Sequence, residues 1–203
     1  MTIRVLLVDD HPIVREGLRA LVQGHLGIDV VGEAADAAQA LRQVMACQPD
    51  VVVLDLTLPG RGGVDVLPEL VATGARVLVL SMHEGEDVVR AAVQEDVQGV
   101  AVSSYQGGHV EYFTYLVEQL RAQGRGDIRI YGGGGGVIVP SEIELLHERG
   151  VAHIFSPQDG QRMGLAQMIN SMIEACDVPP HRDGNVDTTA LIAGSEQIGR
   201  AHV

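Results

Sequence analysis

Short apolar, β-branched runs alternate with helical patterns along most of this chain, and no other feature constrains the fold as strongly. Between the runs, apolar residues recur at the three-and-four spacing of a buried helix face, as in Val110, Phe113, Leu116, Val117 and Leu120. The runs lack polar alternation, which indicates strands covered by helices on both faces of a parallel sheet. Seven strands are predicted: Arg4–Val8, Asp29–Gly32, Val51–Asp55, Arg76–Ser81, Gly99–Ser103, Ile128–Tyr131 and Ala152–Phe155.

The expected architecture is a doubly wound, flavodoxin-like α/β fold with one parallel sheet. Right-handed crossovers favour the order 2-1-3-4 for the first strands, and the later strands extend one edge to give 2-1-3-4-5-6-7. Two separate sheets are the second alternative. They would leave apolar strand edges unpaired, and one sheet is therefore preferred.

Charge and composition exclude several classes of function. The hydrophobic content of 46% suits a globular fold with a core. The net charge is −13, so a surface that binds nucleic acid is not expected. No apolar run approaches the roughly 20 residues of a membrane span, and a cytoplasmic protein without membrane contacts is expected. Cys47 and Cys176 are too few for a disulfide scaffold or a cysteine metal site. The chain has 14 Arg and no Lys, which excludes any chemistry that requires a lysine.

Three carboxylates are expected to meet at the carboxyl edge of the sheet. Asp9 and Asp10 end the first strand and Asp55 ends the third, which lies beside it in the predicted order. Clustered carboxylates repel one another unless a hard cation such as Mg²⁺ lies among them, and a carboxylate beside such a cation can act as a nucleophile toward phosphorus. The alternative is that Asp9 or Asp10 caps the helix after Pro12.

These motifs resemble the receiver family of response regulators over residues 1–83. They are Val8-Asp9-Asp10-His11-Pro12, Asp55 followed by Leu58-Pro59-Gly60, and Leu80-Ser81 at a strand end. The resemblance implies Asp55 as phosphoacceptor, Asp9 and Asp10 as Mg²⁺ ligands, Ser81 as a switch contact and a histidine kinase as partner. The family has a Lys where this chain has Ser103. We therefore expect slow phosphoryl acceptance and a broken switch.

Residues 84–176 resemble the cobalamin-binding domain of the fused isobutyryl-CoA mutase and methylmalonyl-CoA mutase family. Ser103-Ser104-Tyr105 matches its Ser-x-Leu element, and Gly132-Gly133 matches its glycine pair at the expected distance. The resemblance implies that these five residues surround the nucleotide tail of cobalamin. Small residues at strand ends leave room for such a ligand beside the sheet.

The Asp-x-His-x-x-Gly loop that carries the cobalt ligand in this family is missing. His11 lies in a partial match, and His83 follows the strand expected next to the fifth strand, so His83 is the better substitute. Without the His and its orienting Asp, cobalamin binding is expected to be weak or lost.

Three functional classes remain open. They are a phosphoacceptor receiver, a cobalamin-binding part of an acyl-CoA mutase that would partner a catalytic domain, and a non-functional chimera that folds because both parents share one architecture. Catalysis by this chain alone is not expected. Residues 177–203 are expected to be a disordered tail, and residues 198–203 look like a translated sequencing adapter. Both a natural fusion and a sequence-assembly join are compatible with this pattern.

Overall fold

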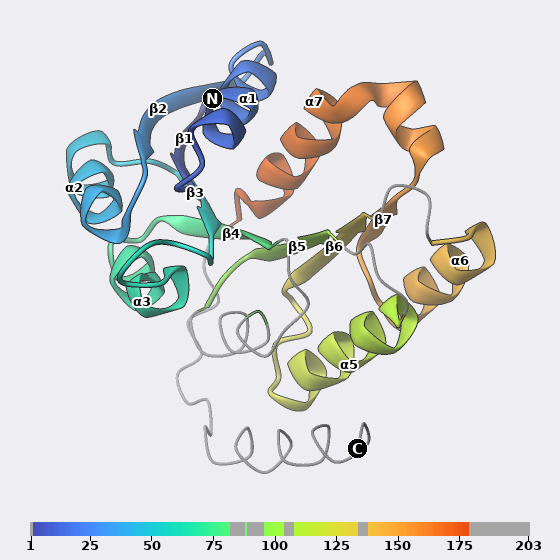
Figure 1. The fold of residues 1–203 in the computed structure, drawn as a ribbon. Helices are drawn as coiled ribbons and strands as arrows, with labels where there is room; N and C mark the ends of the chain where they lie inside the picture. Colours follow the sequence, from blue (N-terminus) through green and yellow to red (C-terminus); the bar gives the residue numbers. More distant parts are fainter. Residues whose placement is uncertain (1, 82–87, 89–95, 104–107, 134–137, 179–203) are drawn as a thin grey trace.

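The computed structural model describes residues 2–81, 88, 96–103, 108–133 and 138–178. They contain a single seven-stranded parallel sheet with the order β2-β1-β3-β4-β5-β6-β7 (Figure 1). The predicted architecture and strand order are confirmed, and the two-sheet alternative is wrong. The strands are β1 (Ile3–Val8), β2 (Ile28–Ala34), β3 (Val51–Asp55), β4 (Arg76–Ser81), β5 (Gly99–Ser103), β6 (Arg129–Gly133) and β7 (His153–Phe155).

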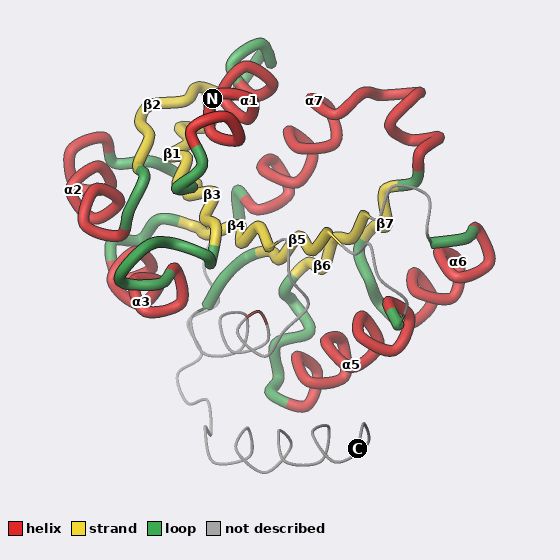
Figure 2. Tube along the Cα trace, viewed as in Figure 1, coloured by secondary structure: helices red, strands yellow, loops and turns green. Residues whose placement is uncertain are grey.

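Helices cover both faces of the sheet, as Figure 2 shows. One face carries α1 (Pro12–Val22) and α7 (Pro157–Cys176), and the other carries α2 (Ala37–Cys47), α3 (Gly63–Ala72), α5 (His109–Ala122) and α6 (Pro140–Arg149). Each face has its own apolar core. The α1/α7 face buries residues such as Leu7, Val53 and Ile173, whereas the opposite face buries Leu54 and Phe113. Adjacent strand residues thus point into different cores, because side chains alternate along a strand.

Three predicted strands, β3, β4 and β5, have the bounds expected from the sequence. β6 extends two residues further than expected, so that Gly132 and Gly133 are strand residues paired with β5. The sequence patterns did not specify α6 or α7. Both helix starts have recognisable signals. Pro140 lies in the first turn of α6, where the Val139 amide donates to the Glu142 side chain, and Ser156 accepts a hydrogen bond from the Asp159 amide at the start of α7.

Helix α7 crosses the sheet and is tied to it at its carboxyl end. Gly164 interrupts the helix with φ 77° and ψ 158°, a conformation that suits glycine. Beyond the helix, the Arg76 guanidinium donates to the Val178 carbonyl at 3.0 Å and to Asp177 at 2.6 Å. The rest of the expected tail, 179–203, lies outside the described residues. Within the described ranges, no helix is both long and apolar enough to span a membrane.

Candidate cation site and adjoining groove

The three carboxylates expected at the sheet edge lie together. Asp9 directly follows β1 and Asp55 ends β3, and these two strands pair in parallel. One oxygen each of Asp9, Asp10 and Asp55 and one ring nitrogen of His11 all lie within 4.8 Å of one another. His11 was not expected in this cluster, although its position directly after the acid pair is a signal that could have indicated it.

These carboxylates do not cap the following helix. The N-cap residue of α1 is His11, whose side chain makes no capping hydrogen bond. The Asp9 Oδ1 accepts a hydrogen bond from the His11 amide at 2.7 Å, and the Asp55 Oδ1 accepts one from the Thr57 amide at 3.0 Å. Each bond orients a carboxylate at the turn after its strand. The capping alternative therefore does not account for the cluster.

The donor set fits a hard cation. Asp10 Oδ1 is enclosed and makes no hydrogen bond, although His11 Nδ1 lies 2.9 Å away in an ion-pair contact. An enclosed carboxylate oxygen without a hydrogen bond is costly, and a divalent cation would satisfy it. Burial raises the pKa of Asp55, and the negative charges of Asp9 and Asp10 raise it further. The clustered carboxylates thus favour a bound cation.

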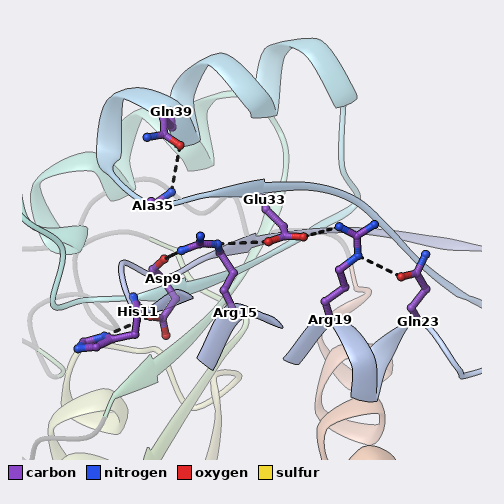
Figure 3. A network of polar contacts seen from close by, with 8 residues as sticks. All are labelled: Asp9, His11, Arg15, Arg19, Gln23, Glu33, Ala35 and Gln39. Atoms are coloured by element: carbon purple, nitrogen blue, oxygen red, sulfur yellow. Dashed lines mark hydrogen bonds and ion pairs between the residues drawn. The ribbon is translucent and has the colours of Figure 1, made fainter. Parts of the chain in front are cut away.

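An arginine and glutamate network holds the end of β1 in place (Figure 3). Glu33 of β2 accepts from Arg15 at 3.2 Å and from Arg19 at 2.6 Å, both on α1. Arg15 also donates to the backbone carbonyl of Asp9 at 2.6 Å. The Arg15 guanidinium thus bridges Glu33 and the Asp9 carbonyl, and this bridge fixes the backbone of the acid pair.

The two serines singled out from the sequence lie next to the carboxylates along the sheet. Ser81 is buried at the end of β4, and Ser103 ends β5. Both line one groove together with Asp55. The Ser103 hydroxyl makes no hydrogen bond with any residue that the structure describes. Ser103, which the sequence matched to a lysine of the receiver family, thus contributes a neutral hydroxyl to the groove that the carboxylates line.

This groove has a volume of about 900 Å³ and extends from the carboxylates along the strand ends to residues of α7. The sequence did not indicate it, because α7 was not specified. Its lining is mostly apolar: Val14, Leu18, Leu80, Ala101, Val102, Phe155, Pro157, Leu165, Met168 and Met172, with polar groups from Asp9, His11, Asp55, Thr57, Ser81, Ser103, Tyr131 and Ser156, and three glycines, Gly132, Gly133 and Gly160.

The two glycines expected to contact cobalamin have different surroundings. A Cβ on Gly132 would lie 2.6 Å from Phe113 Cζ and 2.5 Å from Ile154 Cδ1, so its small size serves packing against α5. A Cβ on Gly133 would meet only the Phe155 carbonyl, at 3.9 Å, beside the groove. Gly133 and Ser103 therefore leave space at the groove. Ser104, Tyr105 and His83 lie outside the described residues.

Comparison with known proteins agrees with the acidic site. Residues 5–102 match the family model of the response regulator receiver domain. Over these residues the chain is similar to receiver domains. The chain is similar to the DNA-binding transcriptional activator DevR/DosR of Mycobacterium tuberculosis, with 36% identity over 107 residues. The matched residues are 52% of this chain and 49% of that protein. The chain is also 27% identical to the nitrate/nitrite response regulator protein homolog of Haemophilus influenzae, over 82% of this chain and 75% of that protein.

A second similarity is to a different class of protein. The fused isobutyryl-CoA mutase of Geobacillus kaustophilus is 60% identical over 111 residues, which are 54% of this chain and 10% of the mutase. The chain thus spans about a tenth of that relative and about half of DevR/DosR. Among solved structures, a LuxR-family response regulator from Aurantimonas is 31% identical with a TM-score of 0.48, covering 83% of this chain and 99% of that one.

Proposed function

We propose that the N-terminal part of the chain is a cation-dependent phosphoacceptor, with Asp55 as the acceptor and Asp9 and Asp10 as Mg²⁺ ligands. The observation that carries this proposal is the convergence of the three carboxylates within 4.8 Å at adjacent strand ends. Asp10 adds an enclosed oxygen without a hydrogen bond. Receiver domains receive their phosphoryl group from histidine kinases, so a histidine kinase is the expected partner.

In the proposed reaction, an Asp55 oxygen forms a bond to phosphorus while the bond between phosphorus and the donor's leaving atom breaks. The leaving group keeps the electron pair of that bond. A bound Mg²⁺ would supply positive charge to the phosphoryl oxygens. The Thr57 amide holds the other Asp55 oxygen at 3.0 Å and so fixes which oxygen is free to attack. Ser81, at the end of the next strand, lines the same groove and is the proposed switch contact.

Ser103 sets the limit on this function. A neutral hydroxyl cannot make the charge-assisted contact that a lysine ammonium makes to a phosphoryl group. We therefore expect slow phosphorylation of Asp55 and no phosphorylation-dependent dimerisation. The DNA-binding role in the name of DevR/DosR belongs to that protein, and at a net charge of −13 we propose no nucleic-acid surface here.

Labelling with a small phosphodonor tests this proposal. The full chain is incubated with acetyl phosphate and Mg²⁺, and intact mass is followed over time. The expected result is a slow gain of one phosphoryl group that is absent in Asp55→Asn and without Mg²⁺. The variant Ser103→Lys should label faster, because it adds the missing cation. Labelling of Asp55→Asn at the unmodified rate would place the acceptor elsewhere and reject the assignment.

A second candidate is a partial cobalamin-binding module in residues 84–176. The mutase similarity supports it, as does the space beside Ser103 and Gly133. Ser104, Tyr105 and the glycine Gly132 would complete the contacts to the nucleotide tail. With His83 as the only proposed cobalt ligand, binding should be weak or lost.

Spectral titration with hydroxocobalamin separates the alternatives. A His-ligated spectrum that His83→Ala abolishes would support a working module, whereas the absence of any shift would favour a non-functional chimera. Amplification of source DNA across residues 75–95 tests whether the two parts are joined in the gene.

A further inference from the structure

One row of residues in register crosses the sheet at the base of the groove. Asp55 of β3 pairs with Leu80 of β4, Leu80 with Ala101 of β5, and Ala101 with Tyr131 of β6. All four line the groove. Since neighbouring strands lie about 4.8 Å apart, the two ends of this row are about 14 Å apart. The row thus has a carboxylate at one end and a phenol at the other.

The middle of the groove is apolar, and the side chain at the centre of the row is small. Ala101 occupies the centre of the row, and Leu165, Met168 and Met172 of α7 contribute the opposite wall. Leu165 is 55% exposed, which leaves apolar surface at the rim. An elongated apolar body fits such a space and would gain free energy by leaving water there.

Charge is distributed unevenly along the groove. Asp9 and Asp55 lie at one end, and His11 is the only basic residue among the described residues of the lining. The Arg15 guanidinium, which reaches the Asp9 carbonyl, is paired with that carbonyl and with Glu33. The carboxylate end therefore attracts a cation and repels an anion.

Tyr131 is a second, independent indication of a ligand. Only 6% of this residue is exposed, yet its hydroxyl makes no hydrogen bond with any residue that the structure describes. The hydroxyl is not among the fully buried side-chain oxygens, although the residue as a whole is nearly buried and lines the groove. It is therefore available to a hydrogen-bonding group on a molecule in the groove.

We propose that this groove binds an amine-bearing amphiphile, with its ammonium at Asp9 and Asp55, its apolar chain along Leu80 and Ala101, and a hydrogen-bonding group at Tyr131. The ammonium neutralises the carboxylates without any phosphoryl chemistry, so this inference goes beyond the phosphoacceptor function. It also implies competition, because Mg²⁺ and the ammonium would use the same carboxylates.

Four probes with one chain length test the proposal by calorimetric titration of the full chain without metal. They are 8-amino-1-octanol, octylamine, 1-octanol and octanoate. The expected order of affinity is 8-amino-1-octanol, octylamine, 1-octanol, with octanoate weakest. Asp55→Asn should weaken both amines about tenfold and leave 1-octanol unchanged, since an ion-paired hydrogen bond contributes about that factor. Glu118→Gln removes an exposed charge on the opposite face and should change nothing.

Two further variants locate the ligand within the groove. Tyr131→Phe should lower the affinity for 8-amino-1-octanol to that for octylamine and leave octylamine itself unchanged. Ala101→Leu should weaken every probe at least tenfold, because it fills the centre of the groove. If Ala101→Leu does not fold, Gly160→Leu replaces it, since a Cβ at Gly160 meets nothing within 4 Å.

Several outcomes would overturn the proposal: no binding of any probe, 1-octanol or octanoate binding as tightly as octylamine, or undiminished binding to a folded Ala101→Leu or Gly160→Leu variant. Saturating Mg²⁺ should weaken the amines and spare 1-octanol. Mg²⁺ binding without amine binding would reject this inference alone. Amine binding without Mg²⁺ binding would reject only the phosphoacceptor function.

Discussion

Gly132 and Phe113 are packed so closely that a Cβ on the glycine would lie 2.6 Å from the Cζ of the ring. Gly132 belongs to β6, and Phe113 is a fully buried residue of α5. The contact shows that one glycine of the Gly132-Gly133 pair is required by the core. Its partner, Gly133, lies on the groove side of the same strand.

Substitutions at the two glycines should therefore have different effects on stability. Gly132→Ala overpacks the core and should lower the free energy of unfolding by about 1–3 kcal/mol. Gly133→Ala meets only the Phe155 carbonyl, at 3.9 Å, and should change stability by less than about 0.5 kcal/mol. Urea denaturation of both variants measures the difference. Equal destabilisation would contradict the assignment of the two glycines to different faces.

Removing the charge of Asp55 should stabilise the metal-free protein. Asp55→Asn relieves the repulsion from Asp9 and Asp10 in a site where burial already raises the pKa of Asp55. We expect a rise in Tm of about 2–4 °C at neutral pH, the shift that about 1 kcal/mol produces in a chain of this size. Thermal melts in a chelating buffer provide the measurement, with Asp65→Asn as a control on α3. A fall in Tm would contradict the claim that the Asp55 charge is repelled by its neighbours in the metal-free protein.

The cap of α7 should make a pH-dependent contribution to stability. Hydrogen bonds from the Ser156 amide and hydroxyl hold the pKa of Asp159 below its ordinary value of 3.8. A depressed carboxyl pKa stabilises the fold above 3.8, and this contribution is lost as the pH falls through the lower, folded-state pKa. Asp159→Ala should cost about 1 kcal/mol at neutral pH and progressively less in acid. Parallel denaturation curves at several pH values check this, and a constant difference would refute it.

A buried arginine, Arg125, links the segments that precede β5 and β6. Arg125, which is 8% exposed, pairs with Asp96 at 2.8 Å and with Asp127 at 3.2 Å. Arg125→Ala removes a buried guanidinium and its ion pairs to Asp96 and Asp127 and should lower the free energy of unfolding by about 2 kcal/mol. The exposed Arg162→Ala should cost less than about 1 kcal/mol. Comparable losses of unfolding free energy in the two variants would show that the Arg125 ion pairs stabilise the fold no more than an exposed pair does.

The sequence was sufficient to predict the sheet because most strands contain a short apolar run, and burial on both faces requires such runs. It also brought Asp9 and Asp55 together, since adjacent parallel strands end at one edge. The role of Gly132 could not be predicted, because whether a glycine leaves space for a ligand or for a neighbouring ring depends on where Phe113 packs. The groove was missed for a related reason. It depends on how α7 crosses Ala101 and Tyr131, which strand patterns do not specify.

Titration of the full chain with Mg²⁺ in a calorimeter tests the central claim, that the three carboxylates form a cation site. The expected result is one weak site that is lost in Asp55→Asn and in Asp10→Ala and retained in the control Asp65→Asn. The Asp10 variant is informative because it removes the enclosed oxygen without touching the proposed phosphoacceptor. Mg²⁺ binding that persists unchanged in both site variants would contradict the account.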